Sequence, residues 1–367
     1  MTKRLVIVQP YVPKYRIPLF SSLVDELARD GIDCVVAAGE PQGIQAARND
    51  RADAEWLVPV RRHEVRVGRA SIKFSNLGRV LSRADGVIVG LEGTSVDAYR
   101  VILNGIFRGM RVGLWGHVAS YIGPPNSIDL ALEKWQMRRA DQVFAYTSGG
   151  ERAALKAGIG SEKITVLMNT VDTNALRDAS TMINDRDINK FVVDHELEGR
   201  RAVAFIGGLD ESKRIAFLAD ALDRLWKVAP DIVLLIGGEG KLAYLLDSAR
   251  SRGQVRILGY VGPTEKVILS RVSKALLMPG RIGLVAVESL FLKMPIVTTD
   301  WPYHAPESEY LIEGESKFTA RNEAGDFADK VLEVVALGRS PQIGEWRYPE
   351  IEDMVENFAN GVKRMLL

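Results

Sequence analysis

The residues best placed to do chemistry follow short apolar runs in the second half of the chain. One run ends in Gly207-Gly208 and is followed closely by Lys213 and Arg214. Glycines allow a ligand to approach the backbone closely, and the two cations suit a phosphate. A second run ends in Gly237-Gly238-Glu239-Gly240. The chain has no Gly-x4-Gly-Lys-Ser/Thr segment, so neither turn is the phosphate loop of an NTPase, and a purely structural role is the alternative for both.

The sharpest feature is the stretch from Met278 to Leu290. An apolar run ends at Met278, a glycine-containing turn follows, and an apolar helix is expected to begin near Leu284. The N–H groups at the start of such a helix form an anion site. Glu288 lies about one turn into this helix, where its carboxylate needs hydrogen-bond partners. Ligand hydroxyls such as those of a ribose would serve, and so would a neighbouring backbone N–H or a lysine.

The elements that must position these residues are short strands alternating with amphipathic helices. Candidate strands cover residues 5–9, 34–38, 86–90, 112–115, 142–146 and 164–167, and a second series covers 202–208, 232–238, 255–258, 275–278 and 296–298. Helical patterns lie between them, for example at 19–29, 95–108 and 215–227. This alternation predicts an α/β protein with two doubly wound, Rossmann-like parallel-sheet domains, joined near residues 172–198. Ligands of such sheets bind beyond the carboxyl ends of the strands.

The end of the chain adds one more helix. Residues 350–367 carry apolar side chains at helical spacing, including Ile351, Val355, Phe358 and Val362. A stripe of this kind must be covered. We expect this helix to cross back and pack on the first domain.

Composition narrows the function classes. A length of 367 residues fits two domains of roughly 100–200 residues each. With 47% hydrophobic and 26% charged residues, the chain is not mainly disordered, collagenous or coiled coil. Its net charge of +1 argues against a dedicated nucleic-acid binder.

The charge is unevenly distributed, with a net of +5 over residues 1–175 and −4 over residues 176–367. The excess lies in a basic cluster formed by Arg61, Arg62, Arg66, Arg69, Lys73, Arg79 and Arg83. A basic face suits an anionic surface or substrate, with solvated loop charge as the alternative. The segment Ser71–Arg83 mixes apolar and basic residues, which suggests an interfacial helix.

Cysteine content and hydropathy bear on location. The single cysteine, Cys34, lies in an apolar run and reads as a core residue, so the chain fits a reducing compartment. We expect no signal peptide, because the first residues lead directly into a strand pattern. No run of about 18 apolar residues exists to span a membrane. The expectation is a cytoplasmic protein, with peripheral contact at the inner face of an anionic membrane as an added hypothesis.

The combined pattern resembles the GT-B fold glycosyltransferases, in particular glycosyltransferase family 4, whose members are retaining and use sugar nucleotides. The matching segments are 205–209 with Lys213, 234–240, 255–261, 283–290 and 295–300, together with 139–141 and 163–172 in the first half. The resemblance covers nearly the whole chain. It implies two domains facing across a cleft: an acceptor-binding domain at 1–175, onto which helix 350–367 packs, and a nucleotide-sugar-binding domain at 176–349.

The resemblance also implies site residues. Lys213 would neutralise the diphosphate of a UDP- or GDP-type donor, Glu288 would hold the ribose hydroxyls, and His117 would border the donor sugar; these three are the catalytic assignments. The implied donor-binding set is Gly207, Gly208, Arg214, Gly238, Tyr260, Val261, Gly280, Arg281, Ile282, Gly283 and Leu284. In the first domain, Tyr11 and Tyr15 would stack on an acceptor sugar, and Lys14 and Arg16 would meet an acceptor phosphate.

Two departures from the family pattern bear on activity. The first glutamate of the family's Glu-x7-Glu signature falls at Gly280, and the usual phosphate-binding arginine falls at Gly208. The site is therefore either degraded or rebuilt, with Arg281, Arg214 and Arg16 as replacement cations. The missing glutamate leaves the donor sugar open.

The expected function is a hexosyltransferase that moves a sugar from a nucleotide-diphosphate sugar to a glycan, lipid-linked or small-molecule acceptor, with retention, in polysaccharide or glycoconjugate biosynthesis. No cofactor and no metal are expected. Two alternatives stay open, a sugar-nucleotide 2-epimerase of the same fold and a non-catalytic partner of an active transferase.

Overall fold

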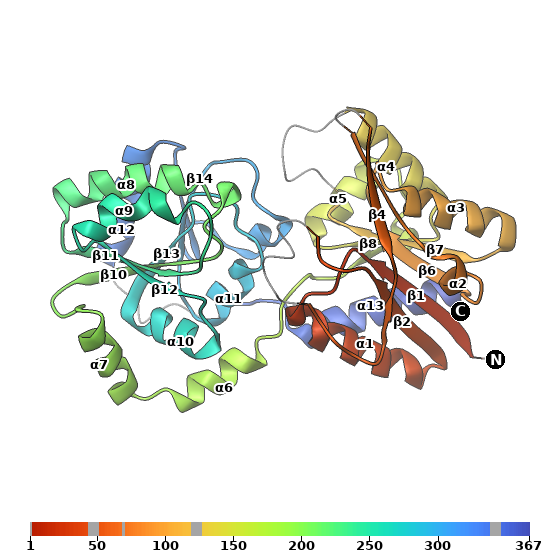
Figure 1. The fold of residues 1–367 in the computed structure, drawn as a ribbon, viewed down its shortest axis with the longest axis horizontal. Helices are drawn as coiled ribbons and strands as arrows, with labels where there is room; N and C mark the ends of the chain where they lie inside the picture. The colour runs from red at the N-terminus through yellow and green to blue at the C-terminus, as the bar shows by residue number, and fades with distance from the viewer. Residues whose placement is uncertain (1, 43–50, 68–69, 119–126, 338–345) are drawn as a thin grey trace. The chain divides into compact units, whose positions relative to one another are not determined.

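A computed structural model describes residues 2–42, 51–67, 70–118, 127–337 and 346–367. The chain divides into two compact units (Figure 1). Unit 1 comprises Met1–Asp172 with Pro349–Leu367, and unit 2 comprises Thr173–Tyr348. The sequence placed the corresponding boundaries at residues 175 and 349.

Unit 1 is built on a seven-stranded sheet with the order β3-β2-β1-β6-β7-β8-β9. Its strands are β1 (Lys3–Gln9), β2 (Ile32–Ala38), β3 (Leu57–Pro59), β6 (Gly86–Gly90), β7 (Arg111–Gly116), β8 (Gln142–Ala145) and β9 (Ile164–Val166). All neighbouring strands pair in parallel. The sequence pattern did not mark β3, which is short and half exposed.

Helices cover both faces of this sheet, and β1 shows how the sequence alternates between them. Leu5 and Ile7 pack into the core formed with α1 (Ile17–Arg29) and α13 (Ile351–Leu366). Val6 and Val8 pack into the opposite core. The opposite core contains residues of α2 (Gly78–Leu81), α3 (Val96–Arg108), α4 (Ser127–Arg139) and α5 (Ser148–Lys156).

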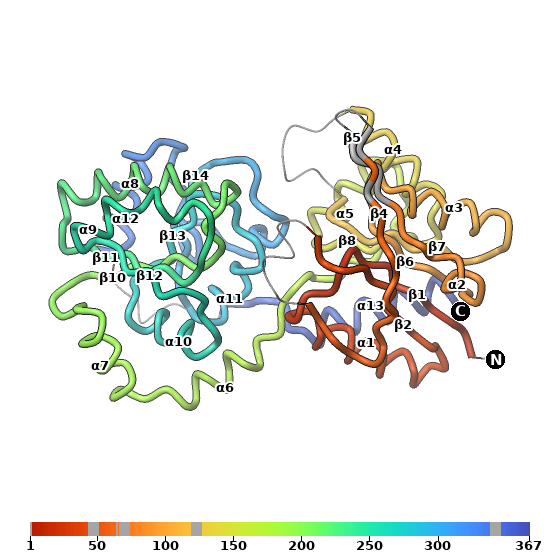
Figure 2. Tube along the Cα trace, in the orientation of Figure 1, coloured from red at the N-terminus to blue at the C-terminus, as the bar shows by residue number. Residues whose placement is uncertain are grey.

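The C-terminal helix α13 belongs to unit 1, where it lies beside α1 in both ribbon and tube (Figures 1 and 2). Its stripe of Ile351, Val355, Phe358 and Val362 is buried against the sheet. Gly361 has no room for a side chain, because a Cβ there would lie 2.5 Å from the Phe144 ring. The close approach of helix to sheet therefore depends on this glycine.

Unit 2 carries a six-stranded parallel sheet with the order β12-β11-β10-β13-β14-β15. Its strands are β10 (Arg201–Ile206), β11 (Ile232–Gly237), β12 (Val255–Gly259), β13 (Ser273–Leu277), β14 (Ile296–Thr299) and β15 (Lys317–Ala320). Its helices are α6 (Asn174–Met182), α7 (Asp185–Asp194), α8 (Ile215–Val228), α9 (Asp247–Ser251), α10 (Pro263–Val272), α11 (Val285–Phe291) and α12 (Ala324–Leu337). Short 3-10 turns lie at Glu211–Lys213, Ala243–Leu246 and Pro306–Tyr310 in this unit, and at Lys14–Arg16 and Ser161–Lys163 in unit 1.

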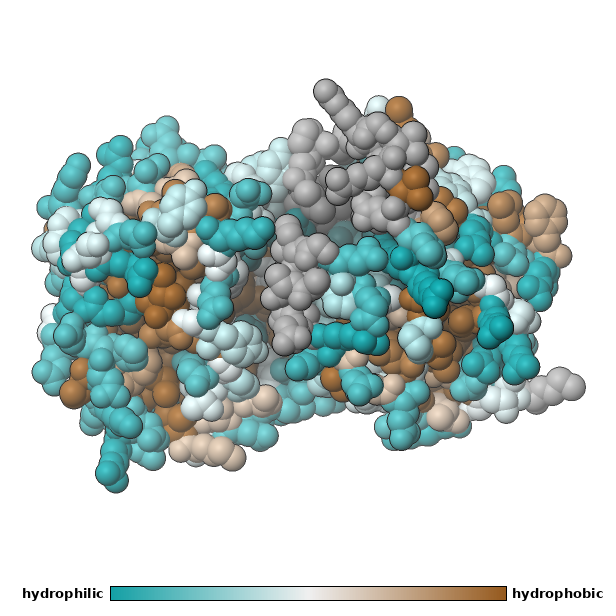
Figure 3. Space-filling model, viewed as in Figure 1, coloured by the Kyte–Doolittle hydropathy of each residue, from teal (hydrophilic) through white to brown (hydrophobic). Residues whose placement is uncertain are grey.

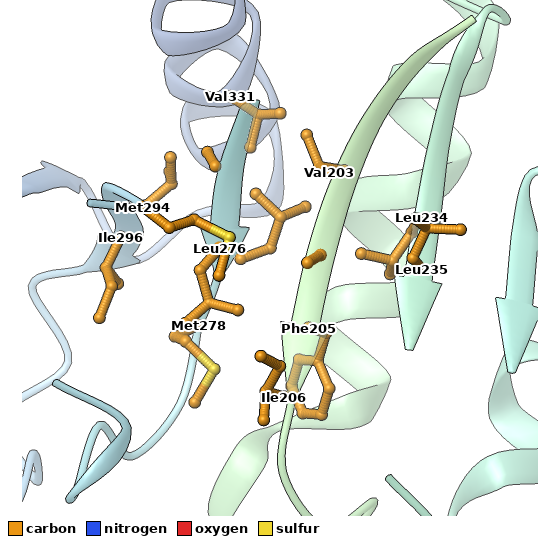
Figure 4. Close-up of a cluster of buried hydrophobic side chains, with 14 of the residues drawn as sticks. Val203, Phe205, Ile206, Leu234, Leu235, Leu276, Met278, Met294, Ile296 and Val331 are labelled. Atoms are coloured by element: carbon orange, nitrogen blue, oxygen red, sulfur yellow. The ribbon is translucent and has the colours of Figure 1, made fainter. Parts of the chain in front are cut away.

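One hydrophobic core holds unit 2 together. Phe205, Leu234 and Leu276 project from neighbouring strands, and Val331 of α12 belongs to the same core (Figure 4). These strands are apolar on both faces, as a sheet covered on both sides requires. The predicted α/β class with two Rossmann-like parallel sheets is confirmed.

One predicted element is wrong. The segment Ser71–Arg83 is not a helix: β4 (Arg62–Val67) and β5 (Ala70–Ser75) form an antiparallel hairpin, and only Gly78–Leu81 is helical. Alternation of residues at period two outweighed the weak helical stripe here. The interfacial helix expected at this place therefore does not exist.

Candidate functional site

The candidate site lies where the strand order of unit 2 reverses. Strands β10 and β13 are neighbours, and the chain leaves them toward opposite sides of the sheet. Ligands of open parallel sheets bind at this switch point, beyond the carboxyl ends of the strands. Two segments meet there: the β10 loop, residues 207–214, and the β13 loop, residues 278–284. Both contain predicted donor-binding residues.

Glycines let the backbones at this edge touch. A Cβ at Gly238 would lie 1.9 Å from the carbonyl oxygen of Gly207. The Gly207 N–H donates to Gly237 across 3.0 Å. Gly208 is less crowded, since a Cβ there would meet Asp210 Oδ2 at 3.1 Å and nothing else within 3.5 Å. Gly207 and Gly238 thus have a structural reason to be glycine, whereas a side chain at Gly208 requires only a small shift of the Asp210 carboxylate.

Lys213 and Arg214 tie the β10 loop to the β13 loop. The Lys213 ammonium donates to the carbonyl oxygen of Arg281. Arg214 Nη1 donates to the carbonyl of Pro279 (3.0 Å) and to Thr299 Oγ1 (3.2 Å). Its guanidinium also stacks 4.2 Å from the Phe217 ring, and burial lowers its pKa. Two predicted phosphate-binding cations therefore lie together, and the hydrogen bonds of Arg214 also hold the β13 loop in place.

Gly280 explains the departure at the first signature glutamate. A Cβ on Gly280 would lie 2.5 Å from the Lys213 carbonyl carbon and 2.6 Å from the Ser212 carbonyl oxygen. Arg281 N–H also donates to Ser212 across 2.8 Å. The backbone of Ser212 and Lys213 fills the space that a side chain at position 280 would need. The two loops therefore pack too closely at this point to admit a glutamate side chain at position 280 without a shift of the backbone.

His304 is a residue of this region that sequence reasoning missed. Its Nδ1 accepts the Ile282 N–H at 3.3 Å, and its Nε2 lies 3.2 Å from the Thr299 carbonyl oxygen. Burial, with nearby Lys317, Lys213 and Arg214, lowers the pKa of His304. A neutral imidazole with Nε2 protonated satisfies both contacts. Nothing in the sequence marks a histidine so far from the loop it supports.

The β13 loop keeps two backbone donors and one cation near the site. The N–H groups of Gly283 and Leu284 donate to no residue in the described ranges. Arg281 is half-buried, and burial lowers its pKa although Glu307 raises it. Ile282 is fully buried and its N–H is committed to His304. Of the predicted loop donors, Gly283 and Leu284 are thus the ones available for an anion.

Glu288, on α11, is paired with a lysine that was not singled out from the sequence. Its Oε1 lies 2.7 Å from Lys266 Nζ of α10, and both side chains are about one-fifth exposed. The lysine partner was one of the alternatives that the apolar helix left open. Oε2 has no donor within the described chain. The carboxylate can therefore hold Lys266 and still accept a second hydrogen bond.

Tyr260 and Val261 lie at the end of β12 and differ in exposure. Tyr260 is 87% exposed, and Val261 is buried against Gly237. The Val261 side chain is a core residue, so only its backbone could meet a base.

In unit 1, His117 follows β7 directly. Its ring packs edge-on against Tyr146, with centroids 4.5 Å apart. The next residue, Val118, has a φ of 63°, which a β-branched residue rarely adopts. The backbone therefore turns sharply just after the histidine, at the carboxyl edge of this sheet.

The predicted acceptor residues follow β1. Tyr11 and Arg16 are buried, whereas Lys14 and Tyr15 are exposed. Arg16 donates to Asn169 Oδ1 at 2.8 Å, and its guanidinium stacks on Tyr15 (5.3 Å to the ring centroid). Arg16 lies in unit 1, and its role as a replacement cation stays a prediction.

No cluster of three or more histidine, cysteine, aspartate or glutamate side chains suited to a metal occurs among the residues with described placement.

Comparisons with known proteins match these loops to a family. Residues 200–336 match the model described as Glycosyl transferases group 1. Mycobacterium tuberculosis glycogen synthase is 26% identical over 178 residues, covering 46% of this chain and 40% of that protein. The phosphatidyl-myo-inositol mannosyltransferase of the same organism is 30% identical over 133 residues, covering 34% and 35%. The chain thus spans about two-fifths or less of the length of these two relatives.

Solved structures resemble the chain over nearly its whole length. A Rickettsia africae glycosyltransferase superposes with a TM-score of 0.66 at 13% identity, covering 100% of this chain and 96% of that one. Anabaena HepE, in complex with UDP and glucose, gives 0.64 at 14% identity, covering 99% and 100%. The UDP-GlcNAc 2-epimerase of Methanocaldococcus jannaschii gives 0.61 at 15%, covering 98% and 99%. At these identities the likeness shows a shared fold.

Proposed function

We propose that this chain, which has the GT-B fold and carries a Glycosyl transferases group 1 domain at residues 200–336, is a glycosyltransferase that uses a nucleotide-diphosphate sugar. The observation that carries the proposal is the meeting of Lys213, Arg214 and Arg281 on two interlocked loops at the switch point of unit 2. Three cations beside backbone N–H groups suit a diphosphate. Membership of family 4 and a retaining outcome stay predictions.

The donor would lie across the two loops. Lys213 and Arg281 would face the diphosphate, with the Gly283 and Leu284 N–H groups beside them. Glu288 would accept from a ribose hydroxyl through Oε2, which has no described donor. The binding of UDP by Anabaena HepE, at the level of fold alone, makes a uridine nucleotide the first donor to test.

The chemistry would depend on electrostatic stabilisation. When the bond between sugar and diphosphate breaks, negative charge develops on the leaving oxygen. Fixed cations and N–H groups stabilise that charge best when they are already in place. The contacts of Lys213 with Arg281 and of Arg214 with Pro279 hold the loops in position before a donor arrives.

The acceptor would bind unit 1, where Tyr11, Lys14, Tyr15 and Arg16 follow β1 and His117 follows β7. An exposed tyrosine ring such as Tyr15 suits the face of a sugar. His117 would border the transferred sugar. A glycan, a lipid-linked sugar or a small glycoside would each fit this description.

A sugar-nucleotide 2-epimerase is the second candidate, because the M. jannaschii epimerase has the same fold. An epimerase needs carboxylates about the sugar, and the packed Gly280 backbone leaves no room for one at that position. A non-catalytic partner of an active transferase is the third candidate. Analysis of products from a sugar nucleotide separates transfer, epimerisation and inactivity.

A thermal-shift screen across UDP- and GDP-sugars tests the donor assignment. A ligand present at 100 times its dissociation constant stabilises the folded state by about 2.7 kcal/mol. We expect one nucleotide class to raise the Tm and the matching nucleoside diphosphate to do the same. No shift with any nucleotide, in protein that unfolds cooperatively, would remove the basis of the proposal.

We also propose that the protein acts in the cytoplasm and makes peripheral contact with an anionic membrane. Within the described residues no helix is long and apolar enough to cross a bilayer. The end of α3 carries Leu103, Ile106 and Phe107 as exposed apolar side chains, beside Arg108. Figure 3 shows hydrophobic surface at this end of the helix. This face, in place of the Ser71–Arg83 segment, is the surface that would enter the interface.

A further inference from the structure

Arg16 is a buried charged residue at the carboxyl edge of the unit 1 sheet. It follows β1, and only 8% of its surface is exposed. Nη2 donates to Asn169 Oδ1 at 2.8 Å, and Nη1 contacts Met354 Sδ at 3.7 Å. The guanidinium also lies 5.8 Å from the centroid of the Trp115 ring. Asn169 follows β9 and Trp115 is on β7, so three strand ends surround this cation.

None of these partners is negatively charged. An amide oxygen and a thioether accept hydrogen bonds, and the rings of Tyr15 and Trp115 supply only cation–π attraction. Across the described ranges no carboxylate forms an ion pair with Arg16. A buried charge is costly unless an opposite charge compensates it. The cation–π contacts offset part of that cost, and the remainder indicates an anion that binds here.

Other buried polar groups at the same edge also lack partners. Thr147 follows β8 and is fully buried, yet its Oγ1 has no hydrogen-bond partner in the described chain, although it occupies the N-cap of α5. Trp115 Nε1, in a side chain that is 95% buried, likewise has no described partner. A hydroxyl and an indole N–H both donate. Trp115 Nε1 is a donor without an acceptor, and its ring lies beside the Arg16 guanidinium, a cation without an anion. Together they indicate an incomplete anion site.

We infer that the carboxyl edge of the unit 1 sheet binds a phosphate group, with Arg16 as its principal ligand. Phosphate is favoured over carboxylate because a second cation, the exposed Lys14, stands two residues earlier and matches a second negative charge. The inference rests on the proposed function in one respect, that the phosphate belongs to the acceptor. The glycosyl acceptor is then a phosphorylated molecule, either a soluble phosphoester or a phosphate-bearing lipid.

Calorimetric titration with inorganic phosphate tests the site. The full chain is first saturated with UDP or GDP, whichever binds, so that the unit 2 phosphate position is already filled. Wild-type protein should still bind phosphate, and Arg16→Met should weaken that binding about tenfold or more, as expected for loss of a hydrogen bond to a charged group. Arg29→Met, an exposed arginine on α1, is the matched control and should leave the affinity unchanged.

Three results would overturn the inference: no phosphate binding by the wild type, equal binding by Arg16→Met, or equal affinity for acetate. If Arg16→Met fails to fold, Lys14→Met tests the same site at an exposed position, and it should also weaken phosphate binding. Nucleotide binding to unit 2 is measured in the same samples. Failure of the donor proposal and failure of the phosphate site are therefore seen separately.

Two further ligands identify the source of the phosphate. Glycerol 3-phosphate represents a soluble phosphoester, and phosphatidylcholine vesicles with or without phosphatidic acid represent a lipid headgroup. Competition by either one that depends on Arg16 supports the site and names its ligand class. Competition by neither contradicts the acceptor assignment.

Discussion

The Glu288 carboxylate serves two partners in this account, and the two can be separated. Oε1 holds Lys266, and Oε2 is proposed to accept a ribose hydroxyl. If Glu288 had a purely structural role, that role would be its ion pair with Lys266. In that case removing either partner should have the same consequence.

Glu288→Ala is expected to weaken nucleotide affinity about 10- to 150-fold, since hydrogen bonds to charged groups contribute roughly 1.5–3 kcal/mol. Lys266→Met is the matched control: it breaks the same ion pair but keeps the carboxylate, so affinity should change by only a few-fold. Titration calorimetry with the nucleoside diphosphate measures both. Equal losses in the two variants would assign Glu288 to structure alone.

Gly280 and Gly208 are predicted to respond oppositely to the side chains that the family pattern would place there. Gly280→Glu should lower stability by at least about 1–3 kcal/mol, the usual cost of overpacking, because its Cβ would overlap the backbone of Lys213. Gly208→Arg should fold normally, because its tightest contact in the described chain is with the end of the Asp210 side chain, which can shift, and should tighten diphosphate binding. Denaturant unfolding and nucleotide titration report the two quantities. A stable Gly280→Glu protein with restored affinity would contradict the packing argument.

At the residue scale, the sequence identified charged residues next to strand ends but not their distant supports. Lys213 and Glu288 were found because each follows a readable strand or helix signal. Lys266 and His304 were not, since they come from other elements and reach these residues only through the fold. The reason for Gly280 was equally hidden, because it depends on a loop nearly 70 residues earlier in the chain.

The element that organises the candidate site is the pair of loops after β10 and β13, supported from behind by His304. The imidazole accepts the Ile282 N–H only while Nδ1 is unprotonated. Protonation would replace that bond with a repulsion between donors. Loop geometry is therefore linked to pH.

Acidification should destabilise the protein through His304. Its pKa in the folded state is lowered, so between that value and the ordinary 6.5 the unfolded chain binds more protons. Its contribution to stability is complete above about pH 6.5 and is lost as the pH falls through the folded-state pKa, at about 1.4 kcal/mol per unit of depression. His304→Gln should flatten this part of the curve of unfolding free energy against pH. Ser82→Ala, an exposed change that removes no titratable group, should not.

If the His304→Gln and wild-type curves fall in parallel below about pH 6.5, the histidine is not the titrating group in this window.

At the scale of elements, hydrophobic periodicity predicted the core strands and the helices that cover them. It did not predict the hairpin or the close packing of individual helices. The runs predicted as strands at 86–90 and 232–238 are apolar on both faces and correspond to β6 and to β11, which ends one residue earlier. Part of the hairpin β4–β5 was interpreted as a helix because Ile72 was grouped with Leu77 and Val80, although Ile72 and Phe74 alternate with polar residues as in a strand. The close seating of α13 depends on Gly361, which only the three-dimensional packing reveals.

For the whole molecule, strand order determines where ligands can bind. In both large sheets the strand order reverses beside the first strand. The reversal lies between β1 and β6 in unit 1 and between β10 and β13 in unit 2. This places one candidate site in each unit, which suits a reaction with a donor and an acceptor. The sequence anticipated two sheets, whereas the order of the strands came from the structure.

Membrane contact is a property of the whole molecule that the exposed end of α3 should control. The chain should sediment with anionic vesicles at low salt and be released at high salt. Phe107→Ser should reduce binding at least about tenfold, because burying a phenylalanine contributes roughly 1.5–3 kcal/mol. Met182→Ser, which removes a similarly exposed apolar side chain on unit 2, is the control. Failure of the wild type to sediment at low salt would remove the membrane proposal and leave the transferase proposal intact.

The central claim, that unit 2 activates a nucleotide-diphosphate sugar for transfer, is tested most directly by product analysis. The protein is incubated with the sugar nucleotide that stabilises it and with a phosphorylated acceptor, and nucleoside diphosphate and sugar products are quantified by mass spectrometry. The account predicts release of the diphosphate together with a glycosylated acceptor, and loss of both in Lys213→Met. Recovery of a 2-epimerised sugar nucleotide without transfer, or of unchanged donor from protein that binds it, would contradict the claim.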